Sequence, residues 1–203
     1  AEAASRSITL VKNDNALPFN FSNEEKIVVI GNTYIENLYH SVKYYHENTE
    51  LIIASEPFNN DQLVQLEDAS ALVVGTYTFD VSGRDPNSAQ MQMVNQLIEQ
   101  VDVPVIGVGI RNPYDIMAFP EIDAYVAQYG FRDASFQATA ATLFGENRPT
   151  GLLPVSIPNS NGDVLFQYGP GLSDLKEHMN NEKITCSLID RSLRTWLSNC
   201  SFC

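Results

Sequence analysis

Cysteine is absent from most of this 203-residue chain, because residues 1–185 contain none. A disulfide framework therefore does not hold the main body together. The three cysteines, Cys186, Cys200 and Cys203, all lie at the end of the chain. Two of them could pair, although spacing alone does not establish a pair. No histidine stands beside them, so the zinc signal is weak, and we expect neither a metal nor another cofactor.

Positively charged residues are also few. Lys and Arg number 12 against 25 Asp and Glu, which gives a net charge of −13. Such a surface would repel a phosphate backbone, so we expect no nucleic-acid partner. No apolar run approaches the ~20 residues that span a bilayer, so we expect no membrane span. The N-terminus lacks the basic-then-apolar order of a signal peptide and begins as though cut from something longer.

What the chain does contain is a set of short apolar runs rich in β-branched residues. Continuous apolar runs of this length are typical of strands in a sheet covered on both faces. We therefore predict strands at residues 26–31, 50–55, 71–79 and 103–110, with a weaker one at 123–130. The segment 151–158 contains two prolines, which favours an edge strand or an extended covering segment.

Helical patterns lie between these runs. Residues 1–10 are interpreted as the end of a helix, and 36–46, 60–69 and 87–101 as further helices. The best-defined helix, 133–144, has Asp133 as its predicted N-cap and Gly145 just past its end. Its apolar face consists of Phe136, Ala140, Leu143 and Phe144. Strands that alternate with helices predict an α/β fold with a mostly parallel sheet.

Signals for other chemistry are weak. The segment GVGIRNPYD at 107–115 has Gly-x-Gly after a predicted strand, but it lacks the third glycine of a dinucleotide fingerprint. We interpret RNPYD as a turn. His40, His46 and His178 have no cysteine or carboxylate partner at ligand spacing, so we interpret them as solvated side chains.

Three phrases together resemble a known family. They are SITLVKNDNALPF at 7–19, ATLFGENRPTGLLPVSIP at 141–158 and FQYGPGLSDL at 166–175. In this order and at these spacings they resemble the C-terminal, non-barrel domain of glycoside hydrolase family 3. The resemblance covers residues 1–175, and the Cys-containing segment 176–203 matches nothing in that family. We therefore predict one domain at 1–175 followed by an unmatched tail.

The resemblance implies a fold and a partner. The fold is a three-layer α/β/α sandwich with a mostly parallel sheet of about six strands. The partner is a (β/α)8 barrel, which in this family normally precedes this domain in the same chain, binds the sugar and supplies the nucleophilic Asp. An amino-sugar ligand would lie at the interface of the two domains.

Residues 76–98 indicate which branch of the family the chain resembles. Retaining glycosidases need two groups about 5 Å apart across the scissile bond. The β-glucosidase branch keeps its acid/base Glu in a long loop here, but this stretch is short and contains no Glu before Glu99. Its Thr-Tyr-Thr and Ser-x-Gln-Met phrases resemble the N-acetylglucosaminidase branch, where an Asp–His dyad on a barrel loop is the acid/base. The resemblance thus implies no catalytic residue on this chain.

The loop at 80–86 is the remaining candidate for contact with a ligand. It follows a predicted strand, and ligands meet open α/β sheets at such ends. We expect Asp80, Ser82 and Arg84 to lie next to the substrate, and Arg84 to be exposed in the isolated domain. Its guanidinium could bind a carboxylate or a sugar hydroxyl. The alternative, equally weighted, is that Asp80 and Arg84 form a surface pair or cap the helix at 87–101.

The leading hypothesis is an accessory domain of a β-N-acetylglucosaminidase that hydrolyses terminal N-acetylglucosamine from cell-wall or chitin-type sugars, inactive by itself. The alternative is a free-standing carbohydrate- or peptide-binding module, which would need a closed, polar surface where the barrel docks. A nucleotide-binding regulator would need a phosphate loop, which we do not find. A secreted or envelope-associated bacterial parent is favoured over a cytoplasmic one.

Overall fold

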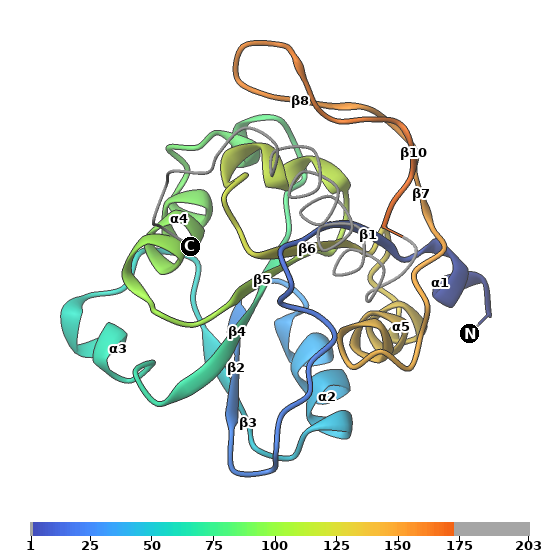
Figure 1. Cartoon of the computed structure of the whole chain (residues 1–203). Coiled ribbons are helices and arrows are strands. Elements are labelled where there is room, and N and C mark those ends of the chain that lie inside the picture. The colour runs from blue at the N-terminus through green and yellow to red at the C-terminus, as the bar shows by residue number, and fades with distance from the viewer. Residues whose placement is uncertain (1, 173–203) are drawn as a thin grey trace, which may run out of the picture.

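The computed structural model describes residues 2–172 and shows a six-stranded sheet with helices on both faces (Figure 1). The strand order is β1-β6-β5-β4-β2-β3. All neighbours are parallel except β1, which runs antiparallel to β6. The strands are β1 (Thr9–Asn13), β2 (Lys26–Gly31), β3 (Thr49–Ile53), β4 (Ala69–Thr76), β5 (Val105–Gly109) and β6 (Ala124–Ala127). The prediction of a mostly parallel sheet of about six strands is confirmed.

Two buried clusters, one on each face of the sheet, make the three layers. Alternate residues of each strand enter opposite clusters, because side chains in a strand point to alternate faces. α2 (Ile35–Tyr45) and α5 (Asp133–Leu143) cover one face, and α4 (Ala89–Gln100) and η2 (Pro113–Ala118) cover the other. The remaining described helices are α1 (Glu2–Ser7), α3 (Asn60–Val64) and the 3₁₀ turn η1 (Ser82–Arg84). None of the described helices is both long and apolar enough to cross a membrane.

The first residues differ from the prediction of a helix over 1–10. The helix α1 ends at Ser7, and the chain then enters β1. Ile8 and Leu10 are fully buried, and Thr9 pairs with Ala127 of β6. β-branched residues suit a pleated, buried surface, and β1 satisfies the backbone groups of β6 that would otherwise form an open edge. The sixth strand therefore comes from the N-terminal phrase.

The two ends of α5 differ in how well they were predicted. Asp133 is the first helical residue rather than the N-cap, which is Arg132. The Asp133 carboxylate accepts a hydrogen bond from the Asn37 amide instead of capping its own helix. At the other end the prediction is confirmed, because Gly145 has φ +77° and its N–H donates to the Thr142 carbonyl. The Glu146 N–H donates to the Ala141 carbonyl, which completes a Schellman motif.

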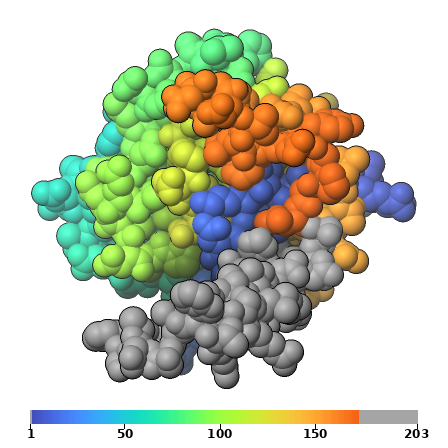
Figure 2. All heavy atoms as spheres, turned by 45° about the horizontal axis from the view of Figure 1, so that its top comes forward, coloured from blue at the N-terminus to red at the C-terminus, as the bar shows by residue number. Residues whose placement is uncertain are grey.

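The segment after α5 lies outside the main sheet, so the edge-strand interpretation of 151–158 is wrong. It forms two small antiparallel pairs, β7 (Leu152–Leu153) with β10 (Gly169–Pro170) and β8 (Ile157–Pro158) with β9 (Val164–Phe166). The N–H groups of Gly151 and Leu172 donate to the carbonyls of Ile8 and Leu10. Figure 2 shows this segment, in orange, against the N-terminal residues in blue. The segment therefore closes over β1, as the alternative of an extended cover predicts.

Candidate functional site

The parallel strands β2, β4, β5 and β6 end together at one side of the sheet, which we call the C-terminal edge. The chain continues from β2 to β3 on one side and returns to place β4 on the other side of β2. The strand order therefore reverses between β2 and β4. In open α/β sheets the crevice beside such a reversal is the usual ligand site. The loop after β4, residues 77–88, borders this position.

Asp80 organises the middle of that loop. Its carboxylate oxygen Oδ1 accepts hydrogen bonds from the Ser82 hydroxyl at 2.7 Å and from the Gly83 N–H at 3.0 Å. These bonds, that from Ser82 first, lower the pKa of Asp80 below its usual value. Asp80 and Ser82 are both exposed. Asp80 thus binds two residues of the short turn η1 and holds a negative charge at the surface.

Arg84 is half-buried, so the expectation of an exposed side chain is wrong. Its guanidinium lies over the ring of Tyr114, 4.9 Å from the ring centroid. Its Nε donates a long hydrogen bond of 3.4 Å to the Asp80 backbone carbonyl. Among the described ion pairs none joins Asp80 to Arg84, and α4 begins after Ser88 without a side-chain cap. The structure therefore brings the three predicted residues into one turn, and whether they contact a substrate stays a prediction.

A buried carboxylate lies beneath this loop. Asp115, in η2, is 0% exposed and accepts hydrogen bonds from the hydroxyls of Thr76, at 2.7 Å, and Thr78, at 2.5 Å. The Asn112 amide donates to the Thr78 hydroxyl and carbonyl. Burial raises the pKa of Asp115, while the hydrogen bonds from Thr78 and Thr76 oppose that rise. This network ties the end of β4 to the segment that follows β5.

Aromatic rings and a second arginine complete the C-terminal edge. The Arg111 guanidinium lies 4.6 Å from the ring centroid of Phe79 and donates to the Tyr77 hydroxyl at 3.1 Å. The Tyr34 ring contacts that of Tyr77 and stacks on Phe131, with centroids 5.2 Å apart. Phe79 is 77% exposed. The edge thus presents a connected aromatic surface with one guanidinium in contact with it.

Asp115, Arg111 and these aromatic residues are not among the predicted site residues. RNPYD was interpreted as a turn, which is confirmed, since Asn112 caps η2 by accepting from the Tyr114 N–H. The sequence nevertheless contained a signal that could have identified Arg111 as a site residue. Arg111 follows the strand β5, just as the candidate loop follows the strand β4. Because neighbouring parallel strands end at the same edge of a sheet, the residues that follow β4 and those that follow β5 are expected to lie close together.

His46, Gly107 and Gly109 have structural roles. His46 is only 3% exposed, and its Nε2 lies 2.6 Å from the Glu25 carbonyl, so its interpretation as a solvated side chain is wrong. His40 is exposed as expected, and His178 lies outside the described residues. A Cβ on Gly107 or Gly109 would collide with the Tyr125 side chain, which explains this Gly-x-Gly without a nucleotide. Within residues 2–172, no group of three or more His, Cys, Asp or Glu side chains could hold a metal ion.

Solved structures with a similar fold include glycosidases of family 3. A fungal multi-domain family 3 β-N-acetylglucosaminidase is 27% identical, with a TM-score of 0.69 over 78% of this chain. The family 3 β-N-acetylglucosaminidase of Paenibacillus sp. str. FPU-7 is 20% identical, with a TM-score of 0.59 over 75%. A β-glucosidase from Listeria innocua is 17% identical, with a TM-score of 0.59 over 74%. The last two likenesses show the fold alone.

This chain corresponds to only part of each of those enzymes. It covers 19% of the fungal enzyme, 31% of the Paenibacillus enzyme and 25% of the Listeria enzyme. A search of curated protein sequences found no match. The profile of the glycosyl hydrolase family 3 C-terminal domain matches residues 8–184, nine residues past the predicted boundary at 175. The chain therefore belongs to the glycosyl hydrolase family 3 C-terminal domain family.

Proposed function

We propose that this chain is the accessory, non-barrel domain of a β-N-acetylglucosaminidase acting on terminal N-acetylglucosamine of cell-wall or chitin-type sugars, and that it is inactive alone. The observation that carries the proposal is the loop between β4 and α4. It is short and contains no Glu, its two carboxylates, Asp80 and Asp85, accept hydrogen bonds from residues of the same loop, and the nearby Asp115 is fully buried. A retaining mechanism needs two reactive groups about 5 Å apart across the scissile bond. The loop supplies no such pair.

The fungal enzyme, at 27% identity, supports the choice of sugar. The fungal and the Paenibacillus proteins are both β-N-acetylglucosaminidases of family 3. The fungal protein has the higher identity to this chain of the two. In the family a barrel domain supplies the nucleophile, and the domain described here would buttress that barrel and shape the rim of its site.

The C-terminal edge favours a docked partner over a free-standing binding module. Phe79 and Val81 are 77% and 76% exposed on the loop after β4, and Phe131 is exposed nearby in the same cluster of rings. Exposed apolar side chains that gather at one place are typical of a surface that another protein surface covers. A free-standing module would instead need a closed, polar surface here.

The test compares three proteins on chromogenic N-acetylglucosaminide: the chain alone, the barrel of the Paenibacillus enzyme alone, and that barrel fused to this chain in place of its own C-terminal domain. The chain alone should not exceed a buffer blank, because it lacks the nucleophile. The fusion should exceed the barrel alone, since the accessory domain completes the rim. Turnover by a purified chain that is free of any barrel contaminant would overturn the proposal.

A matched control keeps a negative result interpretable. The fusion carrying Phe79→Asp places a charge on the surface that should dock, so its rate should fall toward that of the barrel alone. Equal rates for the barrel alone, the fusion and the Phe79→Asp fusion, with all three folded by circular dichroism, would mean that this domain does not serve that barrel.

A further inference from the structure

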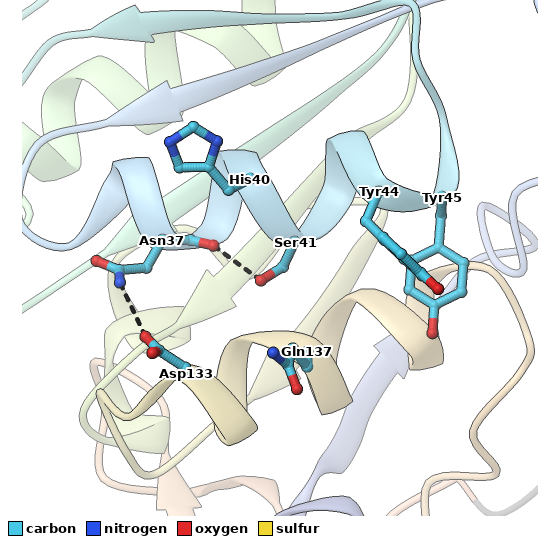
Figure 3. A pocket seen from close by; sticks show the side chains of 7 residues that line it. All are labelled: Asn37, His40, Ser41, Tyr44, Tyr45, Asp133 and Gln137. Atoms are coloured by element: carbon cyan, nitrogen blue, oxygen red, sulfur yellow. Dashed lines mark hydrogen bonds between the residues drawn. The ribbon is translucent and has the colours of Figure 1, made fainter.

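A hollow of about 630 Å³ lies between α2 and α5, the two helices that cover one face of the sheet (Figure 3). Its size falls within the ~300–1,000 Å³ typical of small-molecule sites. Asn37, Ser41 and Tyr44 project from α2, and Asp133 and Gln137 face them from α5 (Figure 3). Residues three and four apart lie on one side of a helix, so each helix presents a row of side chains to the hollow. The rows are polar, which leaves the hollow open rather than filled with apolar side chains.

One end of the hollow is rich in hydrogen-bonding groups that are only partly used. The Asn37 amide donates to the Asp133 carboxylate at 3.2 Å, and the Ser41 hydroxyl donates to the Asn37 backbone carbonyl at 2.9 Å. The second Asp133 oxygen and the Asn37 side-chain carbonyl stay available as acceptors. The Gln137 side chain makes no hydrogen bond within the described part of the chain, so its amide offers both donors and an acceptor.

The other end is an exposed aromatic platform. Tyr44 is 85% exposed and stands edge-on to Tyr45, with centroids 5.3 Å apart and an interplanar angle of 84°. Tyr45 in turn stacks on Phe144, with centroids 5.3 Å apart. Tyr44 is therefore supported by a fixed ring but covered by nothing in the described residues. An exposed ring of this kind contributes little to folding, because it buries little apolar area.

The side chains that line the hollow favour one chemical class of ligand over others. No Lys or Arg lines the hollow, its one carboxylate is that of Asp133 and its one imidazole that of His40. The whole chain carries −13, so an anion would be repelled. A purely apolar partner would bury Asn37, Asp133 and Gln137 without hydrogen bonds, which is costly. A pyranose ring meets both demands, because its C–H face packs on an aromatic ring and its hydroxyls pair with planar amides and carboxylates.

We propose that this groove between α2 and α5 binds a neutral oligosaccharide, with Tyr44 as the stacking platform and Gln137 and Asp133 as hydroxyl partners. None of the residues that line the groove belongs to the loop 77–88. It therefore does not depend on which glycosidase the domain serves. It would hold a sugar polymer on the outer face of the domain, away from the reacting bond.

The test titrates the 203-residue chain with three trisaccharides, chitotriose, cellotriose and trigalacturonate, by calorimetry and by saturation-transfer NMR. Either neutral trisaccharide should bind, and the anionic one should not. Tyr44→Ala should weaken binding about tenfold, which corresponds to ~1.4 kcal/mol. Tyr44→Phe, which keeps the ring, should retain most of the affinity, and Gln137→Ala should lose several-fold.

Phe79→Ala is the matched control, since Phe79 is also a largely exposed aromatic residue but lies at the C-terminal edge, and it should leave the affinity unchanged. Loss of binding in Phe79→Ala with normal binding in Tyr44→Ala would place the sugar at the edge and overturn the proposal. Failure of both neutral trisaccharides to bind, or tighter binding of trigalacturonate, would overturn it as well. In the barrel fusion, Tyr44→Ala should leave hydrolysis of a monosaccharide substrate unchanged. A failure of sugar binding at the groove can therefore be told apart from a failure of the proposed accessory function.

Discussion

Arg84 is held by a residue that lies far from it in the sequence. Its guanidinium lies over the Tyr114 ring and is attracted by the buried Asp115 carboxylate, although both belong to the segment after β5. A cation over a ring at a partly exposed place contributes ~0.5–1 kcal/mol. Arg84 is thus oriented by packing while its charge stays near the C-terminal edge.

We expect Arg84→Ala to lower the free energy of unfolding by only ~0–1 kcal/mol, because the described residues give it no ion pair within bonding distance. In the barrel fusion the same change should raise KM or lower kcat/KM, because a sugar or peptide contact would be lost. Arg6→Ala is the control, since Arg6 pairs with Glu2 on α1 and is exposed. Unchanged kinetics with a lower melting temperature would make Arg84 a structural residue only.

Asp115 should make stability depend on pH. Its pKa is raised above the usual 3.8 by burial, so the folded protein binds this proton more readily than the unfolded chain does. The free energy of unfolding should therefore decrease as pH rises from about 4 through the raised pKa. Asp115→Asn cannot titrate and should lack this component.

Urea denaturation of both proteins between about pH 4 and pH 8 isolates the effect, because groups common to both cancel in the difference. The stability of the wild type relative to Asp115→Asn should fall over that range. A difference that stays constant with pH would show that the Asp115 carboxyl titrates alike in the folded and unfolded chains.

At the scale of elements, α5 shows how a local pattern and a tertiary contact combine. Its face of Phe136, Ala140 and Leu143 is fully buried against the sheet, as its periodicity predicts. Phe144 is only half-buried, and its ring contacts those of Phe19 and Tyr45. Gly145 then reverses the chain beside Pro18, so the end of the helix and the N-terminal phrase fit each other.

Leu143→Ala should lower the free energy of unfolding by about 2–5 kcal/mol, because it removes a large side chain from a packed core and leaves a cavity. Phe144→Ala should cost less than Leu143→Ala, since its ring is partly in solvent. The exposed Gln137→Ala on the same helix should change stability by about 0.5 kcal/mol or less. Equal denaturant midpoints for the parent and Leu143→Ala would contradict the buried position of this side chain.

At the scale of the molecule, the six-stranded sheet and both helical layers are complete within residues 2–172. The last described contacts tie Gly151 and Leu172 to the backbone next to and within β1. The C-terminal end of the described part therefore lies against the edge strand β1.

Truncation after Leu175 should leave the fold intact, whereas truncation after Thr150 should destabilise it by removing the segment that closes over β1. Circular dichroism and the cooperativity of urea unfolding would check both variants. The family match continues to residue 184, so truncation after Ile184 is the control that retains it. Insoluble protein after truncation at 175, with soluble protein at 184, would place residues 176–184 within the domain.

The sequence alone determined the parallel strands, the main helices and the family, because continuous β-branched runs, helical periodicity and the Gly145 stop are local signals. It did not determine that Thr9–Asn13 is the antiparallel sixth strand, since pairing with β6 depends on a partner more than a hundred residues away. Nor did it reveal the Asp115 network, the Arg111 and aromatic surface, or the groove between α2 and α5. Those features join side chains from different elements, and only the tertiary packing brings them together.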